Sequence, residues 1–201
     1  QRLKALIEAV DEEICNRALS VKREIEFALG REAFMSLITK CLAEGTIPTR
    51  VTHNDTKISN VLIDEGTRKG LCVIDLDTVM PGSPLYDFGD LVRSAGGTGS
   101  EDQRDAEGSC LCMERFKAIA SGFMGVAGGL LTADEKRLLA PSAALITLEA
   151  GMRFLADYLN DDRYFKTVRK GQHLDRCRSQ FSLVKSIEEN LDQMSAFVVT
   201  L

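Results

Sequence analysis

The chain has 201 residues, of which 44% are hydrophobic and 27% are charged, and its formal net charge is −5. These proportions predict one soluble globular domain that is long enough to bury a large core. The negative charge and the lack of a dense Lys/Arg patch argue against a nucleic-acid-binding surface, so no nucleic-acid partner is expected.

No membrane partner is expected either. The apolar stretch nearest to a membrane span in length, GFMGVAGGLL at residues 122–131, is shorter than the about 18 residues that a span needs. No signal peptide is apparent, and the six cysteines form no C-x-x-C pair. We interpret the cysteines as reduced thiols and expect a cytoplasmic protein without a disulfide framework or a zinc site.

Two helices are predicted in the first 52 residues, because apolar side chains recur there at three- and four-residue steps. The first stripe consists of Leu3, Leu6, Ile7, Val10 and Ile14. The second consists of Phe34, Leu37, Ile38, Cys41 and Leu42. Gly45 and Pro48 are expected to end the second helix.

A β-hairpin is predicted after these helices. Residues 61–64 and 71–75 are short apolar and β-branched runs, and the EGTRKG segment between them supplies turn-forming glycines. If Asp64 faces Leu71, the paired positions sum to 135 (64 and 71), and this register fixes every other pair in the hairpin.

That register predicts a magnesium site, because it places Asn60 opposite Asp75. Facing side chains on neighbouring strands have β-carbons about 4.5–5.5 Å apart, so this amide oxygen and this carboxylate could bind one Mg²⁺. Side chains alternate along a strand, so Asp77 returns to the face of Asp75 and is a further candidate ligand.

Asp55 precedes the hairpin in a predicted loop, because residues 52–59 show neither the two-residue nor the 3.6-residue apolar period. A carboxylate at this place can accept the proton of a substrate hydroxyl or orient it. An isolated loop aspartate is more often a turn or cap residue. The neighbouring metal pair favours the catalytic interpretation, since a carboxylate beside a metal site is what phosphoryl transfer requires.

The sequence HNDTKISN (53–60) resembles the H-R-D-x-x-x-x-N catalytic loop of the protein-kinase-like fold, and Asp75 stands where the aspartate of D-F-G stands. The closer similarity is to the aminoglycoside phosphotransferase and choline kinase superfamily, which keeps that acid without its Phe-Gly. Within it the chain is most similar to the N-acetylhexosamine 1-kinases. The motifs that carry the similarity, over most of residues 53–194, are HNDTKISNVL, VIDLDTVMPG, YDFGDLVR, MRFLADYL followed by RYF, and HLDRCRSQFSLVKSIEENLDQM.

The resemblance implies that Asp55 is the catalytic base and that Asn60 and Asp75 are the magnesium ligands, with Asp55 and Asp75 also in contact with the substrate. Lys57 falls where protein kinases have a lysine that approaches the transferred phosphate. The alternative is that Lys57 is an ordinary solvated lysine without a role at the phosphate.

The resemblance also implies two supporting residues. His53 would brace the backbone of the loop and would not act as a base. Asp87 matches an acid that usually braces the catalytic loop in related phosphotransferases. The alternative for Asp87 is the N-cap of a helix that starts near Phe88.

The remainder of the chain is predicted to be helical. Residues 95–102 read as a loop and residues 103–124 as a helix, and Thr132 with Glu135 forms a capping box that begins the next helix. The final predicted helix is defined by apolar residues at alternating three- and four-residue steps: Leu174, Cys177, Phe181, Val184, Ile187, Leu191 and Met194.

A buried helix is predicted over residues 141–159, and it carries Glu149, Arg153 and Asp157 at four-residue steps. Buried charges are costly unless they are paired. One interpretation is an internal ion-pair ladder. The other is a polar stripe along the substrate cleft, and the resemblance favours Arg153 and Tyr164 as sugar contacts.

The predicted fold class is a mainly helical α+β lobe, the C-terminal lobe of the protein-kinase-like fold with a small catalytic β-hairpin, over residues 1–201 as one domain. A kinase of this fold also needs a first lobe that covers the nucleotide phosphates, and no G-x-G-x-x-G precedes His53. We therefore expect the protein's own N-terminal nucleotide lobe to lie outside this chain and to be its partner, and we expect little activity from the chain alone.

The predicted function is transfer of the γ-phosphoryl group of ATP, with Mg²⁺, to a sugar hydroxyl, with the anomeric oxygen of an N-acetylhexosamine as the first choice. One alternative is another small acceptor, such as an aminoglycoside, choline or homoserine. The alternative from a different class is a non-catalytic lobe that binds a ligand or a partner chain.

Overall fold

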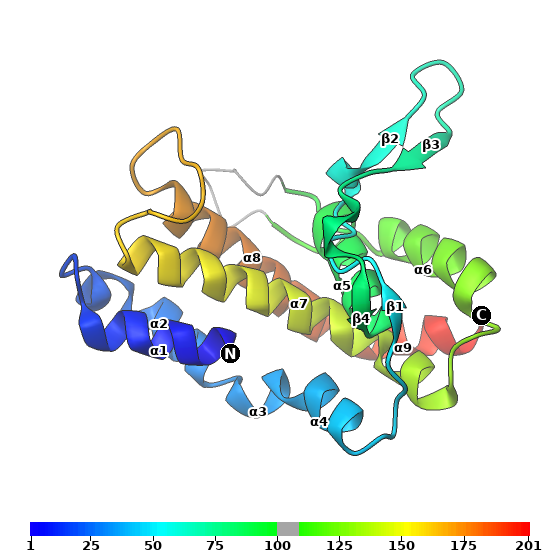
Figure 1. Ribbon diagram of the computed structural model, residues 1–201, viewed down its shortest axis with the longest axis horizontal. Helices are drawn as coiled ribbons and strands as arrows, with labels where there is room; N and C mark the ends of the chain where they lie inside the picture. The colour runs from blue at the N-terminus through cyan, green and yellow to red at the C-terminus, as the bar shows by residue number, and fades with distance from the viewer. Residues whose placement is uncertain (100–108) are drawn as a thin grey trace.

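The computed structural model describes residues 1–99 and 109–201, and its helices dominate the architecture (Figure 1). The helices are α1 (Arg2–Glu12), α2 (Lys22–Leu29), α3 (Glu32–Met35), α4 (Leu37–Ala43), α5 (Pro84–Ala95), α6 (Met113–Ala127), α7 (Ala133–Leu159), α8 (Gln172–Glu189) and α9 (Leu191–Val199). The strands are β1 (Arg50–Thr52), β2 (Val61–Ile63), β3 (Gly70–Val73) and β4 (Met80–Gly82), and the short 3₁₀ helices are η1 (Ala18–Val21), η2 (Ile58–Asn60) and η3 (Leu76–Thr78). This composition confirms the predicted mainly helical α+β class.

Helix α7 is the centre of the lobe, because α8, α5, α1 and α9 all pack against it. Its first half contributes Leu139 to a core cluster that also contains Phe88 and Phe116. Its second half contributes Leu155 to a second cluster, which it shares with Leu6 of α1. One long helix therefore joins the two parts of the core.

The capping box predicted at the start of α7 is confirmed. The Thr132 hydroxyl accepts from the Glu135 N–H (3.2 Å), and the Glu135 carboxylate accepts from the Thr132 N–H (2.7 Å). The Arg50 guanidinium donates to both oxygens of Glu135, at 2.8 and 2.9 Å. The Glu135 side chain is fully buried, so this ion pair fixes β1 against the beginning of α7. Pro141 lies inside α7, so the two helices predicted on either side of it are one.

Replacing Glu135 by Gln is expected to lower the free energy of unfolding by about 2 kcal/mol near neutral pH, because Gln keeps the capping box but loses the charged partner of Arg50. Burial alone would raise the pKa of Glu135, but the hydrogen bonds from Arg50 and Thr132 outweigh it, and the pKa lies below its ordinary value. This group therefore stabilises the fold above its unfolded pKa, and that stabilisation is lost as the pH falls through the folded pKa.

Urea denaturation of both proteins at neutral pH and in the acid range below the ordinary pKa of Glu135 tests this expectation. The difference between wild type and Glu135→Gln should shrink as the pH falls. Glu114→Gln, at an exposed first-turn position of α6, is the matched control and should have little effect. An equal difference at both pH values would contradict the assigned ion pair.

Helix α7 also corrects the expectation that no segment reaches the apolar length of a membrane span. By length and composition it is apolar enough to cross a membrane, but 72% of its most apolar window is buried inside the fold. That burial is what the core helix of a folded domain shows.

Other helix boundaries differ from the predictions. The stripe around Ile38 is divided between α3 and α4, which meet at Ser36, and the predicted final helix is interrupted at Asn190. The helix predicted over 103–124 begins at Met113, and residues 103–108 lie outside the described residues, as do 100–102 of the predicted loop. Apolar spacing continued through both interruptions, so it could not reveal them.

Two small antiparallel sheets stand beside the helices. Strand β1 pairs with β4, and β2 pairs with β3 as the predicted hairpin, which projects away from the helical body (Figure 1). The predicted register is wrong: Val61 faces Val73, and an irregularity after Leu62 places Ile63 opposite Gly70. The pairs therefore sum to 134 and then 133, and not to 135.

Candidate active site

The loop that follows β1 is held to helix α5 by Asp87. The Asp87 carboxylate accepts from the backbone N–H of His53 (2.9 Å) and of Asn54 (2.7 Å). Burial raises the pKa of Asp87, while these two donors oppose that rise. The alternative role of Asp87 as an N-cap is wrong, because α5 begins at Pro84 and its N-cap is Ser83.

His53 connects the same loop to the end of β3. Its Nδ1 accepts from the Asp55 N–H (3.3 Å), and its Nε2 lies 3.1 Å from the Ile74 carbonyl oxygen. These two contacts are compatible only with the neutral tautomer that carries its proton on Nε2. Both ring nitrogens are thus engaged with backbone, which is the arrangement of a bracing residue.

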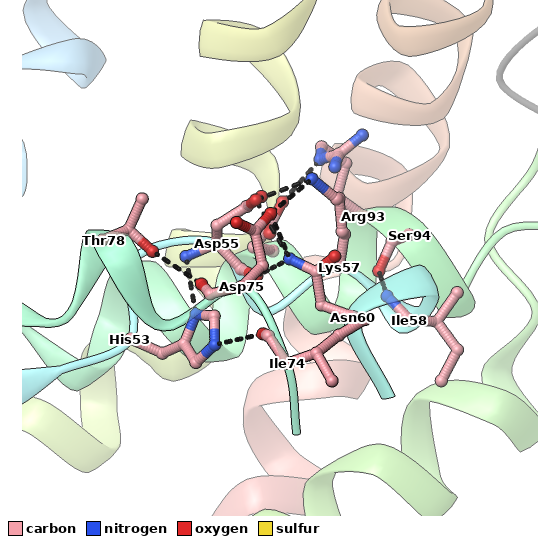
Figure 2. Close-up of polar contacts among 11 residues, drawn as sticks. His53, Asp55, Lys57, Ile58, Asn60, Ile74, Asp75, Thr78, Arg93 and Ser94 are labelled. Carbon is pink, nitrogen blue, oxygen red and sulfur yellow. Dashed lines mark hydrogen bonds and ion pairs between the residues drawn. The ribbon is translucent and has the colours of Figure 1, made fainter. Parts of the chain in front are cut away.

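Asn60 and Asp75 come together with Asp55, as Figure 2 shows. The Asn60 amide nitrogen donates to the Asp55 carbonyl oxygen (2.8 Å), to Asp55 Oδ2 (3.0 Å) and to Asp75 Oδ2 (3.4 Å). Asn60 is buried, whereas the side chain of Asp75 is 48% exposed. The buried amide therefore links the loop aspartate to the aspartate after the hairpin.

The backbone geometry that brings Asn60 and Asp75 together differs from the predicted cross-strand pair. The Asn60 carbonyl oxygen accepts from the Ile74 N–H (2.9 Å), so Ile74, not Asp75, lies opposite Asn60. Asp75 lies two residues after Val73, the last paired residue of β3, and has left-handed backbone angles (φ 63°, ψ 52°). A strand would point its side chain to the other face, and the left-handed turn brings it back toward Asn60.

Lys57 places a positive charge beside both carboxylates (Figure 2). Its Nζ lies 2.6 Å from Asp55 Oδ2 and 3.7 Å from Asp75 Oδ2. Burial acts to raise the pKa of Asp55, but the hydrogen bonds from Lys57 and Asn60 and the charge of Lys57 outweigh it, so the pKa of Asp55 is lowered. Asp55 is therefore ionised at neutral pH, which suits a carboxylate that must accept a hydrogen bond from a hydroxyl.

The expectation that Asp77 shares a strand face with Asp75 is wrong. Asp77 lies in η3, a 3₁₀ helix, and its side chain is exposed. The alternation that placed it beside Asp75 applies only to a strand. The geometric reason for a third ligand at this position is thereby removed.

The chemistry of Asn60 and Asp75 fits a magnesium ion. An amide oxygen and a carboxylate are hard oxygen donors, and Mg²⁺ is commonly held by one or two such groups while it keeps several waters. The bond from the Asn60 amide nitrogen to the Asp55 carbonyl fixes the plane of the amide. The half-exposed carboxylate of Asp75 leaves room for an ion with its waters.

The predicted ion-pair ladder on α7 is wrong. Glu149 pairs with Arg2 of α1 (3.0 Å), whereas the Asp157 carboxylate lies 3.1 Å from Nε2 of His173 and accepts from the backbone N–H groups of Tyr164 and Phe165. Arg153 lies over the ring of Phe165, with 5.1 Å between its Cζ and the ring centroid. Each charge thus finds its partner on another segment of the chain and not one turn away.

Arg153 and Tyr164 both contact Phe165. The guanidinium of Arg153 lies over the Phe165 ring, and the Tyr164 ring meets that ring edge-on, with 4.7 Å between the ring centroids. Tyr164 is 75% exposed. Among the contacts of the described residues, neither forms a hydrogen bond or ion pair with Asp55, Asn60 or Asp75. Their role as sugar contacts therefore stays a prediction.

Sequence reasoning missed Asn54 and Gly82, which shape the loop. Asn54 has a positive φ of 64°, and its amide donates to the Thr78 carbonyl oxygen (3.0 Å). A β-carbon at Gly82 would collide with Thr52 Oγ1 and would lie 2.7 Å from Asn54 Oδ1. The available signal was the residue type: Asn is enriched at positive φ, and Gly permits a close approach.

A comparison with known families supports an enzymatic interpretation of this cluster. Residues 2–118 match the phosphotransferase enzyme family, and this segment is more than half of the chain. It contains the whole loop, the hairpin and α5, and therefore every residue of the polar cluster. The chain belongs to the phosphotransferase enzyme family.

Proposed function

We infer from membership of this family that the protein transfers a phosphoryl group to a small molecule, with ATP as the co-substrate. We propose that this chain supplies the catalytic and acceptor-binding groups for transfer of the γ-phosphoryl group of ATP to a hydroxyl. The observation that carries the proposal is the convergence of Asp55, Lys57, Asn60 and Asp75 within hydrogen-bond or ion-pair distance. Phosphoryl transfer depends mainly on positioning and on neutralising charge, and this cluster offers both.

Asp55 has the role of orienting the acceptor. Its carboxylate accepts a hydrogen bond from the acceptor hydroxyl, whose oxygen then bonds to the γ-phosphorus while the bond to the β–γ bridging oxygen breaks. The hydroxyl proton passes to the Asp55 carboxylate, and ADP leaves. The lowered pKa of Asp55 makes it a weak base, so proton transfer comes late, after the bond to the leaving oxygen has largely broken.

Lys57 has the role of stabilising charge on the transferred group. Its ammonium lies beside Asp55, which is the place that the phosphoryl group must approach. Asn60 and Asp75 are the residues that would hold magnesium. When bound, the ion neutralises phosphate charge and aligns the oxygens.

We extend the proposal to a sugar acceptor, with the anomeric oxygen of an N-acetylhexosamine as the reacting group. The support is the resemblance of the later motifs to N-acetylhexosamine 1-kinases. Arg153 and the exposed phenol of Tyr164 are proposed sugar contacts, and the aromatic group at Phe165 would hold them in place. The remaining parts of the proposal are a cytoplasmic location and a separate N-terminal lobe that covers the nucleotide.

A phosphorylation assay with a panel of acceptors tests this function. The protein with its nucleotide lobe should phosphorylate N-acetylhexosamines in the presence of ATP and Mg²⁺, while the 201-residue chain alone should show little turnover. Choline, homoserine and an aminoglycoside are the competing acceptors. Preference for one of these would replace the sugar assignment, and failure of all acceptors would favour a binding lobe without catalysis.

A further inference from the structure

The connection between α7 and α8, residues 160–171, carries Tyr164 and is mostly exposed (Figure 1). Exposed connections without regular structure are usually mobile, because few contacts hold their backbone. Two polar side chains from elsewhere in the fold, Asp157 and Arg17, hold this connection at successive points. Their contacts therefore restrict a segment that would otherwise move.

Asp157 holds the backbone of Tyr164 and Phe165. Its carboxylate accepts from the Tyr164 N–H (2.8 Å) and from the Phe165 N–H (2.8 Å). His173 Nε2 lies 3.1 Å from Asp157 Oδ2 and 3.3 Å from the Phe165 carbonyl oxygen. Asp157 is 5% exposed and His173 is 0% exposed. A buried carboxylate is costly unless hydrogen-bond donors satisfy it, and here the fold uses one to fix two backbone amides of an exposed segment.

Arg17 holds the beginning of the same segment. Its guanidinium donates to the Tyr158 carbonyl oxygen (2.7 Å), to Asp162 Oδ2 (2.8 Å) and to Asp161 Oδ1 (3.1 Å). Asp161 and Asp162 both have a positive φ, 68° and 57°. Residues other than glycine keep such backbone angles only where the surrounding structure enforces them, and this strain is frequent at ligand sites. Arg17 therefore enforces the turn that precedes Tyr164.

The backbone of this segment positions the two proposed sugar contacts through Phe165. The Phe165 ring contacts the Phe154 ring, with 5.2 Å between the centroids, and it also contacts the Tyr164 ring and the Arg153 guanidinium. A shift of the Phe165 backbone would therefore disturb both Tyr164 and Arg153. Contacts that are already in place before the ligand arrives lower the entropic cost of binding it.

We propose that Asp157 and Arg17 are positioning residues for the acceptor, and that they hold Tyr164 and Arg153 in the arrangement that binds the sugar. The inference rests on the proposed function and adds residues that determine its acceptor affinity. A purely structural role explains these contacts less well, because the segment that they fix buries little apolar surface. Tyr164 is 75% exposed and Val168 is 91% exposed.

Steady-state kinetics of the protein with its nucleotide lobe, with N-acetylglucosamine as the acceptor, test this proposal. Asp157→Asn replaces one accepting oxygen by an NH₂ group, and Arg17→Gln removes the guanidinium that enforces the turn. Each should raise the KM for the sugar by about tenfold, the equivalent of one hydrogen bond. The kcat and the KM for ATP should change by less than about twofold, since the reacting groups are untouched. Calorimetric titration with the same sugar should show the same loss of affinity without turnover.

Thr147→Val is the matched control, because it removes another buried hydrogen bond of α7, from the Thr147 hydroxyl to the Ala143 carbonyl oxygen (2.7 Å). It should bind the sugar like the wild type. Amide hydrogen exchange of residues 161–166 in the 201-residue chain should become faster in Asp157→Asn and Arg17→Gln and stay unchanged in Thr147→Val. Folding of each variant is checked by circular dichroism. The Arg17 side chain is 20% exposed, so Arg17→Gln remains informative if Asp157→Asn does not fold.

Faster exchange with wild-type sugar affinity in both variants would overturn the proposal, since the contacts would then be only structural. An equal loss of affinity in Thr147→Val, or no sugar binding by the wild type, would overturn it as well. The two proposals fail separately. Sugar binding that depends on Asp157, without transfer to any acceptor, refutes the catalytic function alone. Transfer with an unchanged sugar KM in both variants refutes the positioning role alone.

Discussion

Replacing Asp55 by Asn should lower kcat for phosphoryl transfer by about a hundred- to ten-thousand-fold, the usual contribution of a positioned general base. Asn has the size of Asp and can still meet Lys57 and Asn60, so the loop should keep its shape. The variant loses the negative charge that orients the acceptor hydroxyl and takes its proton. The measurement is steady-state turnover of the protein with its nucleotide lobe, and the effect should fall on kcat more than on the KM for the acceptor.

The pH profile provides a second measurement on the same residue. The pKa of Asp55 is lowered, chiefly by Lys57 and Asn60 against the opposing effect of burial. Protonation of Asp55 should therefore not reduce wild-type activity until the pH falls below the ordinary carboxyl range. Asp192→Asn, at an exposed position of α9, is the matched control and should leave kcat unchanged. Undiminished transfer by Asp55→Asn would remove the catalytic assignment.

The hairpin shows what local sequence patterns could and could not predict. Its two apolar runs and its glycine-containing turn were sufficient to predict the two strands and their antiparallel pairing. The register was not predictable: the pairs before the irregularity sum to 134 and the pair after Leu62 sums to 133, so no single register describes the hairpin. Most of the hairpin side chains are exposed, so no buried face was available to specify the register from hydrophobic pattern.

The polar cluster was predicted for a reason that is only partly correct. Asn60 and Asp75 do meet, but through the left-handed backbone of Asp75 and not through a cross-strand pair. A positive φ at an aspartate has a weak sequence signal. The charges on α7 show a second error. Their four-residue spacing suggested an ion-pair ladder within the helix. In the structure, Glu149 instead meets Arg2 and Asp157 meets His173, and both partners come from distant segments. Tertiary partners of this kind cannot be read from local spacing.

Replacing Asp75 by Asn should raise the reaction barrier by several kcal/mol and so reduce magnesium-dependent turnover on the order of a thousandfold. It should also raise the magnesium concentration needed for half-maximal rate. The substitution removes the charge with little strain, because Asn tolerates the left-handed backbone of Asp75 (φ 63°). The two proposed ligands would then both be amides, and two amides hold a divalent cation less well than an amide and a carboxylate. Rate measurements over a magnesium titration give both quantities.

Asp77→Asn is the matched control for this experiment, since it makes the same chemical change two residues away on the exposed side of η3. It should alter the rate by no more than about twofold, as surface substitutions away from partners usually do. A comparable loss in both variants would mean that the negative charge of the whole segment matters and that no discrete ligand pair exists. A loss in Asp77→Asn alone would move the cation to η3. Only a selective loss in Asp75→Asn, with a shifted magnesium requirement, fits a cation held by Asn60 and Asp75 next to the acceptor.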